Sequence, residues 1–265
     1  MNLTGAFDLD TARALCAACA NTYRVPGDLS TPLCHATITR FGDSSSSGSI
    51  PSYTVVAFRG SKSLRDWLTD FEFRRVRNDL GDLVHEGFYR AWLSVREILC
   101  NHPSLQHSNT PLLLTGHSLG GALALLAAEG LLHCGFDVRG VYTFGGPRVG
   151  DGAWALGYDA RLGSKTWRLV DELDLVPRVP FLGFTHAGNR VQLAGAGLAI
   201  NPPLWQLVAR DALQIYRAWK LRRVAQLTDH PITAYTNRLA ACQPAQIFCR
   251  QGYSEHKEES IARPI

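Results

Sequence analysis

Residues 113–121 read Leu-Leu-Thr-Gly-His-Ser-Leu-Gly-Gly, and they are the most informative part of the sequence. It sets a Gly-x-Ser-x-Gly motif, made of Gly116, Ser118 and Gly120, between an apolar run and an Ala- and Leu-rich run. This context is typical of a serine on a strained strand-to-helix turn, where the flanking positions have no room for a Cβ atom. At such a turn the N–H of Leu119 and the helix N-terminus point positive charge toward an oxyanion. The stretch therefore predicts a nucleophilic serine rather than a chance pentapeptide in a loop.

Short apolar runs alternate with helical periodicity on both sides of this motif. We expect helices over 9–23, over 85–100 and after Ser118, and strands over 35–41, 53–58, 111–115, 139–145 and 166–171. Such alternation predicts a mostly parallel sheet with helices on both faces and a site at the carboxyl ends of its strands. With 265 residues, 46% of them hydrophobic, the chain can bury a large core. We therefore expect one α/β domain over residues 1–265.

Composition argues against several other classes of protein. The formal net charge of +4 is small for this length, and no nucleic-acid-binding motif accompanies it, so we expect no nucleic-acid partner. No apolar stretch approaches the ~18 residues that cross a bilayer, which predicts no transmembrane segment. The N-terminal residues show neither a basic region nor a long apolar run, so no signal peptide is seen. Localisation stays open between the cytoplasm and export without a cleaved leader.

The chain has seven cysteines, which cannot all pair with one another, so at least one free thiol is expected. Cys16 and Cys19 form a C-x-x-C in an Ala-rich helical pattern, which favours core packing over metal or redox chemistry. Cys242 and Cys249 are spaced to close a small loop near the C-terminus. No metal-ligand cluster is evident, and we expect neither a metal nor a cofactor.

A serine hydroxyl becomes a good nucleophile when a histidine accepts its proton and a carboxylate orients that histidine. In this architecture the chain order is serine, acid, histidine. His133 lies at the far end of the helix that Ser118 opens, and His256 lies in a charged tail. His230 and His186 remain. The turn-like Thr-Asp-His-Pro segment that contains His230 favours it as the base.

The acid is expected just after the strand over 166–171. Asp174 precedes the sequence Val-Pro-Arg-Val-Pro at 176–180, and prolines hold such a loop extended and fix the direction of the carboxylate. Asp171, Glu172 and Asp229 are alternatives, and Asp229 could instead support the neighbouring histidine from outside the triad. The pattern favours Asp174 without excluding these three.

Six motifs in this order resemble those of the class 3 lipases, the α/β-hydrolases that include fungal triacylglycerol lipases and feruloyl esterases. The similarity extends from about residue 12 to about residue 239. The motifs are Ala-Phe-Arg-Gly-Ser at 57–61, His-Glu-Gly-Phe at 85–88, Gly-His-Ser-Leu-Gly-Gly at 116–121, Tyr-Thr-Phe-Gly-Gly-Pro-Arg-Val-Gly at 142–150, Val-Asp-Glu-Leu-Asp-Leu-Val-Pro-Arg-Val-Pro at 170–180, and Thr-Asp-His-Pro at 228–231 with Tyr235.

The resemblance implies an α/β-hydrolase fold with a helical lid, and it implies catalytic roles for five residues. Ser118 would be the nucleophile, Asp174 the acid and His230 the base. The oxyanion hole would consist of the backbone N–H groups of Ser61 and Leu119, with the Ser61 hydroxyl as a third donor.

Three consequences and departures accompany the resemblance. His186 becomes a structural residue, expected on a strand near the site. The family's Asn-x-x-Asp pattern before the acid reads Asp171-x-x-Asp174 here, which makes the assignment of the acid less secure. The stretch 198–227 is longer than in the compact fungal members.

Two segments are amphipathic. Residues 63–73 place Leu64, Trp67, Leu68 and Phe71 on one helical face, which fits either a helix packed on the core or, as the resemblance implies, a movable lid that opens at a lipid surface. In 198–227, aromatic and basic residues at helical spacing suit docking on anionic lipid or a core-packed helix with arginines reaching solvent.

The resemblance implies a carboxylic-ester hydrolase, above all a triacylglycerol lipase that acts on acylglycerols or other esters at a lipid–water interface without a cofactor. A phospholipase A1 or a feruloyl-type esterase of soluble esters is the alternative within the same chemistry, and the apolar face of 63–73 argues against the feruloyl type. An alternative of another class is a lipid-surface binding module that has lost turnover. The intact serine, acid and histidine argue against this module.

Overall fold

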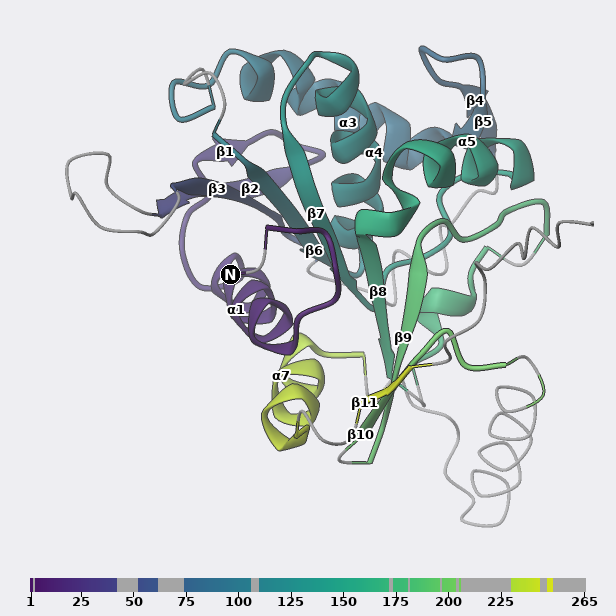
Figure 1. Cartoon of the computed structure of the whole chain (residues 1–265). Helices are drawn as coiled ribbons and strands as arrows, with labels where there is room; N and C mark the ends of the chain where they lie inside the picture. The colour runs from purple at the N-terminus through teal and green to yellow at the C-terminus, as the bar shows by residue number, and fades with distance from the viewer. Residues whose placement is uncertain are drawn as a thin grey trace, which may run out of the picture.

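A computed structural model describes residues 1, 3–41, 52–61, 74–105, 110–171, 174–180, 182–195, 197–203, 205 and 230–243, and the backbone of 247–249. Within these ranges a nine-stranded sheet has the order β1-β2-β3-β6-β7-β8-β9-β10-β11 (Figure 1). Its strands are β1 (Leu29–Ser30), β2 (His35–Phe41), β3 (Tyr53–Phe58), β6 (Leu112–His117), β7 (Val138–Phe144), β8 (Thr166–Asp171), β9 (Asn189–Ala194), β10 (Gly197–Ile200) and β11 (Ile247–Cys249). A separate two-stranded sheet joins β4 (Arg75–Arg77) to β5 (Leu83–His85).

The middle of the large sheet is parallel. Strands β3, β6, β7, β8 and β9 pair in parallel, and the antiparallel pairs β1/β2, β2/β3 and β9/β10 flank them. Every residue of β6 is buried, as expected for a parallel strand covered on both faces. The sequence prediction of a mostly parallel sheet is therefore confirmed.

Helices cover both faces of the sheet, as Figure 1 shows. One face packs against α3 (Glu86–Cys100), α4 (Leu119–His133) and α5 (Gly152–Leu162), and the other against α1 (Leu9–Asn21) and α7 (Ile232–Ala241). Short 3-10 helices cover Gly163–Lys165 and Val176–Arg178. Because α4 is apolar on most of its circumference, it is buried between α3 and the sheet.

Side chains at the helix starts explain two motifs. Asp8 caps α1 because its Oδ2 accepts hydrogen bonds from the N–H and the hydroxyl of Thr11, at 2.8 and 2.6 Å. His85 caps α3, since its Nδ1 accepts from the N–H groups of Gly87 and Phe88 at 3.1 and 3.4 Å. The His-Glu-Gly-Phe motif is thus the N-terminal cap of α3. It comes before the serine turn in the sequence and is not part of that turn.

Several sequence predictions fall on residues that the structure does not describe. The lid face of 63–73 and residues 206–227 of the long stretch lie outside the described ranges, as does the side chain of Cys249. No described helix is long and apolar enough to cross a membrane. A single domain over the whole chain stays a prediction.

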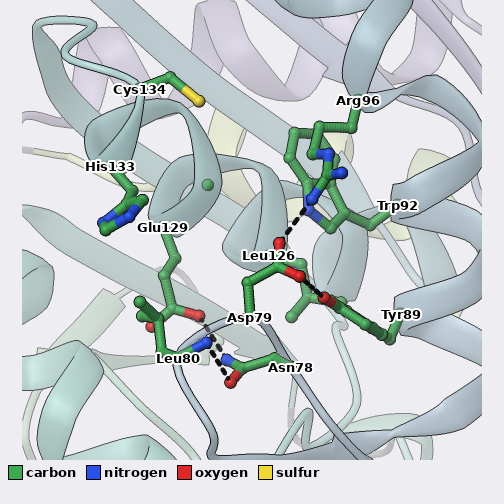
Figure 2. Close-up of a pocket in the computed structure, with 11 residues that line it drawn as sticks. Asn78, Asp79, Leu80, Tyr89, Trp92, Arg96, Leu126, Glu129, His133 and Cys134 are labelled. Carbon is green, nitrogen blue, oxygen red and sulfur yellow. Dashed lines mark hydrogen bonds and ion pairs between the residues drawn. The ribbon is translucent and has the colours of Figure 1, made fainter.

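A buried carboxylate joins α4 to α5 and to the β4–β5 turn. Glu129 on α4 accepts hydrogen bonds from Asn78 Nδ2 at 3.3 Å and from Trp154 Nε1 at 3.0 Å, and it pairs with Arg161. Figure 2 shows Glu129 and Asn78 facing each other across the turn. Burial raises the pKa of the Glu129 carboxyl, while Trp154 and Arg161 lower it. The carboxylate therefore accepts hydrogen bonds from side chains that are buried away from solvent.

We expect Glu129→Ala to lower the free energy of unfolding by roughly 2–4 kcal/mol, because the buried donors of Asn78 and Trp154 lose their acceptor. Urea denaturation followed by circular dichroism measures this loss. Glu97→Ala, at an exposed position of α3, is the control and should change stability by less than about 0.5 kcal/mol. Equal stability of the two variants would contradict the role given to Glu129.

Candidate active site

Ser118 lies on a strained turn between β6 and α4. Its backbone has φ 58° and ψ −129°, its N–H donates to Phe144 O at 2.9 Å, and its carbonyl accepts from Gly121 N at 2.8 Å. A Cβ atom on Gly116 would lie 2.0 Å from Gly120 O, and one on Gly120 would lie 2.2 Å from Phe58 O. The expectation that these two positions have no room for a side chain is confirmed. A non-glycine residue held at positive φ costs about 1–3 kcal/mol, which the surrounding packing has to supply.

Asp174 and His230 form a buried pair beside this turn. His230 Nδ1 lies 3.0 and 2.9 Å from the two carboxylate oxygens of Asp174, and Oδ1 also accepts from Val176 N at 2.9 Å. Because a carboxylate only accepts, Nδ1 carries the hydrogen and the lone pair is at Nε2. Nε2 is buried and has no hydrogen-bond partner in the described part of the chain. The histidine is therefore oriented by the acid and has a basic nitrogen to offer.

His117 joins the serine turn to this pair. Its Nε2 lies 2.7 Å from His230 O, and the two imidazole rings have centroids 4.7 Å apart. Among the described residues no hydrogen bond joins the Ser118 hydroxyl to His230. In enzymes without bound substrate this contact is often long and tightens only in the substrate complex.

Tyr235 on α7 supports the acid from the other side. Its hydroxyl donates to Asp174 Oδ2 at 2.6 Å and accepts from Asp171 N at 3.2 Å. Gly145 leaves the necessary space, since a Cβ atom there would lie 2.5 Å from Asp174 Oδ2. The sequence analysis named Tyr235 as part of a motif but predicted no contact for it. Its contact with Asp174 depends on how α7 packs.

The structure separates the alternative acids. Asp171 is completely buried at the end of β8, and its Oδ2 lies 3.2 Å from Arg238 Nε rather than beside His230. Arg238 thereby balances the carboxylate that stands where the family pattern has Asn. Glu172 and Asp229 lie outside the described residues.

The alternative histidines lie elsewhere. His186 is half-buried, and its Nε2 donates to Pro177 O at 2.6 Å. Burial and the nearby Arg168 lower the pKa of His186 well below its usual value, which keeps it neutral. The prediction of a strand at His186 is wrong, because the segment forms only an isolated bridge at Thr185 before β9 begins. His133 ends α4, and His256 lies outside the described residues.

The two predicted oxyanion donors line one pocket. Ser61 and Leu119 border an open pocket of about 510 Å³, together with Arg59, Gly60 and residues of the 26–35 segment. A chain of hydrogen bonds fixes the loop: Gly60 N donates to the Tyr23 hydroxyl at 3.1 Å, and that hydroxyl lies 2.8 Å from His117 Nδ1. Burial and the neighbouring His230 lower the pKa of His117 to about 3, so it is neutral and accepts from Tyr23. Sequence spacing gave no sign of Tyr23.

A second pocket, of about 140 Å³, lies between α3, α4 and the β4–β5 turn (Figure 2). Its lining includes Trp92, Glu129 and Cys134. None of the predicted site residues lines this pocket. The predicted lid residues Leu64, Trp67, Leu68 and Phe71 lie outside the described ranges. The candidate site is therefore the serine turn, the Asp174–His230 pair and the larger pocket.

The chain is similar to known proteins over its middle part. The family model described as Lipase (class 3) matches residues 55–184. Secreted mono- and diacylglycerol lipase 1 of Fusarium solani is 37% identical over 151 residues, which cover 54% of this chain and 45% of the relative. A lipase of Rhizomucor miehei is 40% identical over 148 residues, which cover 51% of this chain and 40% of the relative. The chain thus spans less than half the length of these curated relatives.

A solved structure shares the architecture. A propeptide complex of the Rhizomucor miehei lipase has a TM-score of 0.59 to this chain at 30% sequence identity, and the match covers 70% of this chain and 67% of that one. This likeness and the parallel sheet with helices on both faces show an α/β-hydrolase fold.

We expect Arg238→Met to lower the free energy of unfolding by roughly 2–4 kcal/mol, because the buried Asp171 carboxylate loses its cation. Adding Asp171→Asn should restore most of the loss, since the double variant has no buried charge at this place. Urea denaturation at neutral pH measures both variants, with the exposed Arg24→Met as control. A double variant no more stable than Arg238→Met alone would rule out charge balance as the function of the pair.

Proposed function

We propose that this chain, which belongs to the class 3 lipase family, is a serine carboxylic-ester hydrolase that acts on acylglycerols. The observation that carries the proposal is the buried Asp174–His230 pair, which packs on His117 next to a serine on a strained turn. In the described part of the chain, Nε2 of His230 has no hydrogen-bond partner. A histidine that a carboxylate orients and that lies next to a serine is the arrangement that activates a serine hydroxyl.

The proposed reaction has two halves. His230 Nε2 takes the proton from the Ser118 hydroxyl as its oxygen attacks the ester carbonyl, and it then gives that proton to the leaving alcohol. The backbone N–H groups of Ser61 and Leu119 stabilise the oxyanion of each tetrahedral intermediate. Water then attacks the acyl-enzyme with His230 as the base, and His230 returns the proton to the Ser118 oxygen as the carboxylic acid leaves. Asp174 keeps the imidazole in the required tautomer and stabilises its positive charge.

Acylglycerols are proposed as substrates because the Fusarium relative is named a mono- and diacylglycerol lipase. The word secreted in that name also supports export of this chain. Action at a lipid–water interface, with 63–73 as a lid, rests on the amphipathic pattern of that segment. We further propose that residues 1–265 form a single domain.

We expect wild-type protein to hydrolyse a triacylglycerol with a rate that rises sharply once the substrate exceeds its solubility and an interface forms. Ser118→Ala should lower the rate by about 10⁴–10⁶, because the nucleophile is lost while binding remains. A pH-stat assay measures both, Ser104→Ala is the control, and circular dichroism checks the fold.

Other outcomes of this assay identify the alternatives. Activity on dissolved short esters without a rise would indicate an esterase with a static 63–73 segment, and a preference for phospholipid vesicles would indicate a phospholipase. If wild-type protein hydrolyses none of these substrates, the proposed function is overturned and the lipid-surface binding module is the remaining alternative.

Tyr235→Phe should lower kcat about 10-fold and leave KM unchanged, because the acid loses one of the hydrogen bonds that position it. The matched control is Tyr158→Phe, which removes a buried hydroxyl bound to Thr166 outside the site. Steady-state kinetics of both variants on a soluble ester separate the two effects. If both variants have wild-type kcat, Tyr235 contributes only packing.

A further inference from the structure

Two cysteines from separate helices meet at the rim of the smaller pocket. Cys100 is the last residue of α3 and Cys134 follows the last residue of α4, and their Sγ atoms are 3.9 Å apart. Cys134 lines the pocket and is drawn beside His133 in Figure 2. The 34-residue separation gives no sequence signal of this meeting.

Close packing of the two helices explains why their ends meet. Gly130 on α4 faces Trp92 on α3, and a Cβ atom at Gly130 would lie 2.5 Å from Trp92 Cζ2. Both residues lie a few turns or less from the cysteines, within the same pair of helices. The separation of the two sulfur atoms is therefore set by the core.

The other described cysteines lie in different surroundings. Cys16, Cys19, Cys34 and Cys242 are buried. The thiols of Cys16 and Cys19 hydrogen-bond Thr236 and Thr115. Cys134 is exposed, and Cys100 is half-buried behind it. An oxidant therefore reaches Cys134 first, with Cys100 as the thiol that lies within reach of it.

We propose that Cys100 and Cys134 form a disulfide that fastens α3 to α4 when the protein meets a small-molecule disulfide such as oxidised glutathione. The Cys134 thiolate attacks one sulfur of oxidised glutathione, which forms a mixed disulfide and releases one glutathione thiolate. Cys100 then loses its proton and attacks the Cys134 sulfur, which releases the second glutathione. Two protein thiols are oxidised, and one glutathione disulfide is reduced to two thiols. The sulfur atoms need only move from 3.9 Å to about 2.05 Å apart.

The bond would close a loop around the serine turn. Strand β6, Ser118 and α4 all lie between the two cysteines in the sequence. Closing a loop of this length restricts the unfolded chain, so the oxidised protein should melt roughly 5–10 °C higher than the reduced protein. Such a bond persists in an oxidising environment, and the proposal is independent of the hydrolytic reaction.

The test uses the full chain, reduced and then incubated with oxidised glutathione. Peptide mapping by mass spectrometry after alkylation in denaturant should find a cross-link between the peptides that contain Cys100 and Cys134. Differential scanning fluorimetry should show the higher Tm, and a phosphine reductant should reverse both changes. Neither readout needs a substrate, so a failure here is distinct from a failure of the proposed hydrolysis.

Variants show whether the stabilisation belongs to this pair. Cys134→Ser should have the same Tm before and after oxidation, whereas Cys242→Ser should keep the oxidation-dependent increase. The mapping of wild-type protein decides the matter even if a variant folds poorly. Glutathione that stays on Cys134 without a cross-link would overturn the proposal, as would a cross-link that leaves Tm unchanged.

Discussion

Three backbone segments come close together at the serine turn, and the elements around the site are arranged by this contact. Gly116 and Gly120 touch each other across the turn, and Gly120 also touches Phe58 at the end of the neighbouring strand β3. Because β3 and β6 are paired in parallel, the loop after β3 has to pass directly over the first turn of α4. One steric requirement thereby sets the direction of α4, the position of Ser118 and the position of the loop that carries Ser61.

Hydrogen bonds and an ion pair hold the buried polar groups around the site. Asp174 has His230 and Tyr235 as partners, and Asp171, three residues earlier, has Arg238. His117 remains neutral between Tyr23 and His230. A buried ion left without its partner is costly, so each of these pairs constrains how closely α7 has to pack on the sheet.

Local patterns were sufficient to predict much of the fold. Strands β2, β3 and β8 begin and end where alternation and β-branched runs indicated, and α1 begins after its capping Asp8. The prediction of a strand around His186 was wrong, because Gly183 and Gly188 have positive φ angles that interrupt strand geometry on either side of it. Periodicity describes neighbours in the chain, and it does not register such interruptions.

The residues of the candidate site that occur in a motif were predictable from the sequence. The contacts that depend on packing between distant elements were not. Ser118, Asp174 and His230 each occur in a short pattern, and the structure brings the last two together. The separation of Asp171 from the site depends on its pairing with Arg238, which lies in α7. Tyr23 contacts the site from the end of α1, nearly a hundred positions before the serine turn, and no local pattern reports such a contact.

The packing of α7 against α1 determines when during synthesis His230 can join the serine turn. Arg13 on α1 donates to the carbonyls of Leu239 and Cys242 at the end of α7, and His230 enters the site directly before that helix. During synthesis the serine turn emerges from the ribosome more than a hundred residues before the histidine. A growing chain therefore contains Ser118 before it contains His230. The pairing of Asp174 with His230 therefore forms only after residue 230 and the helix that follows it have been made.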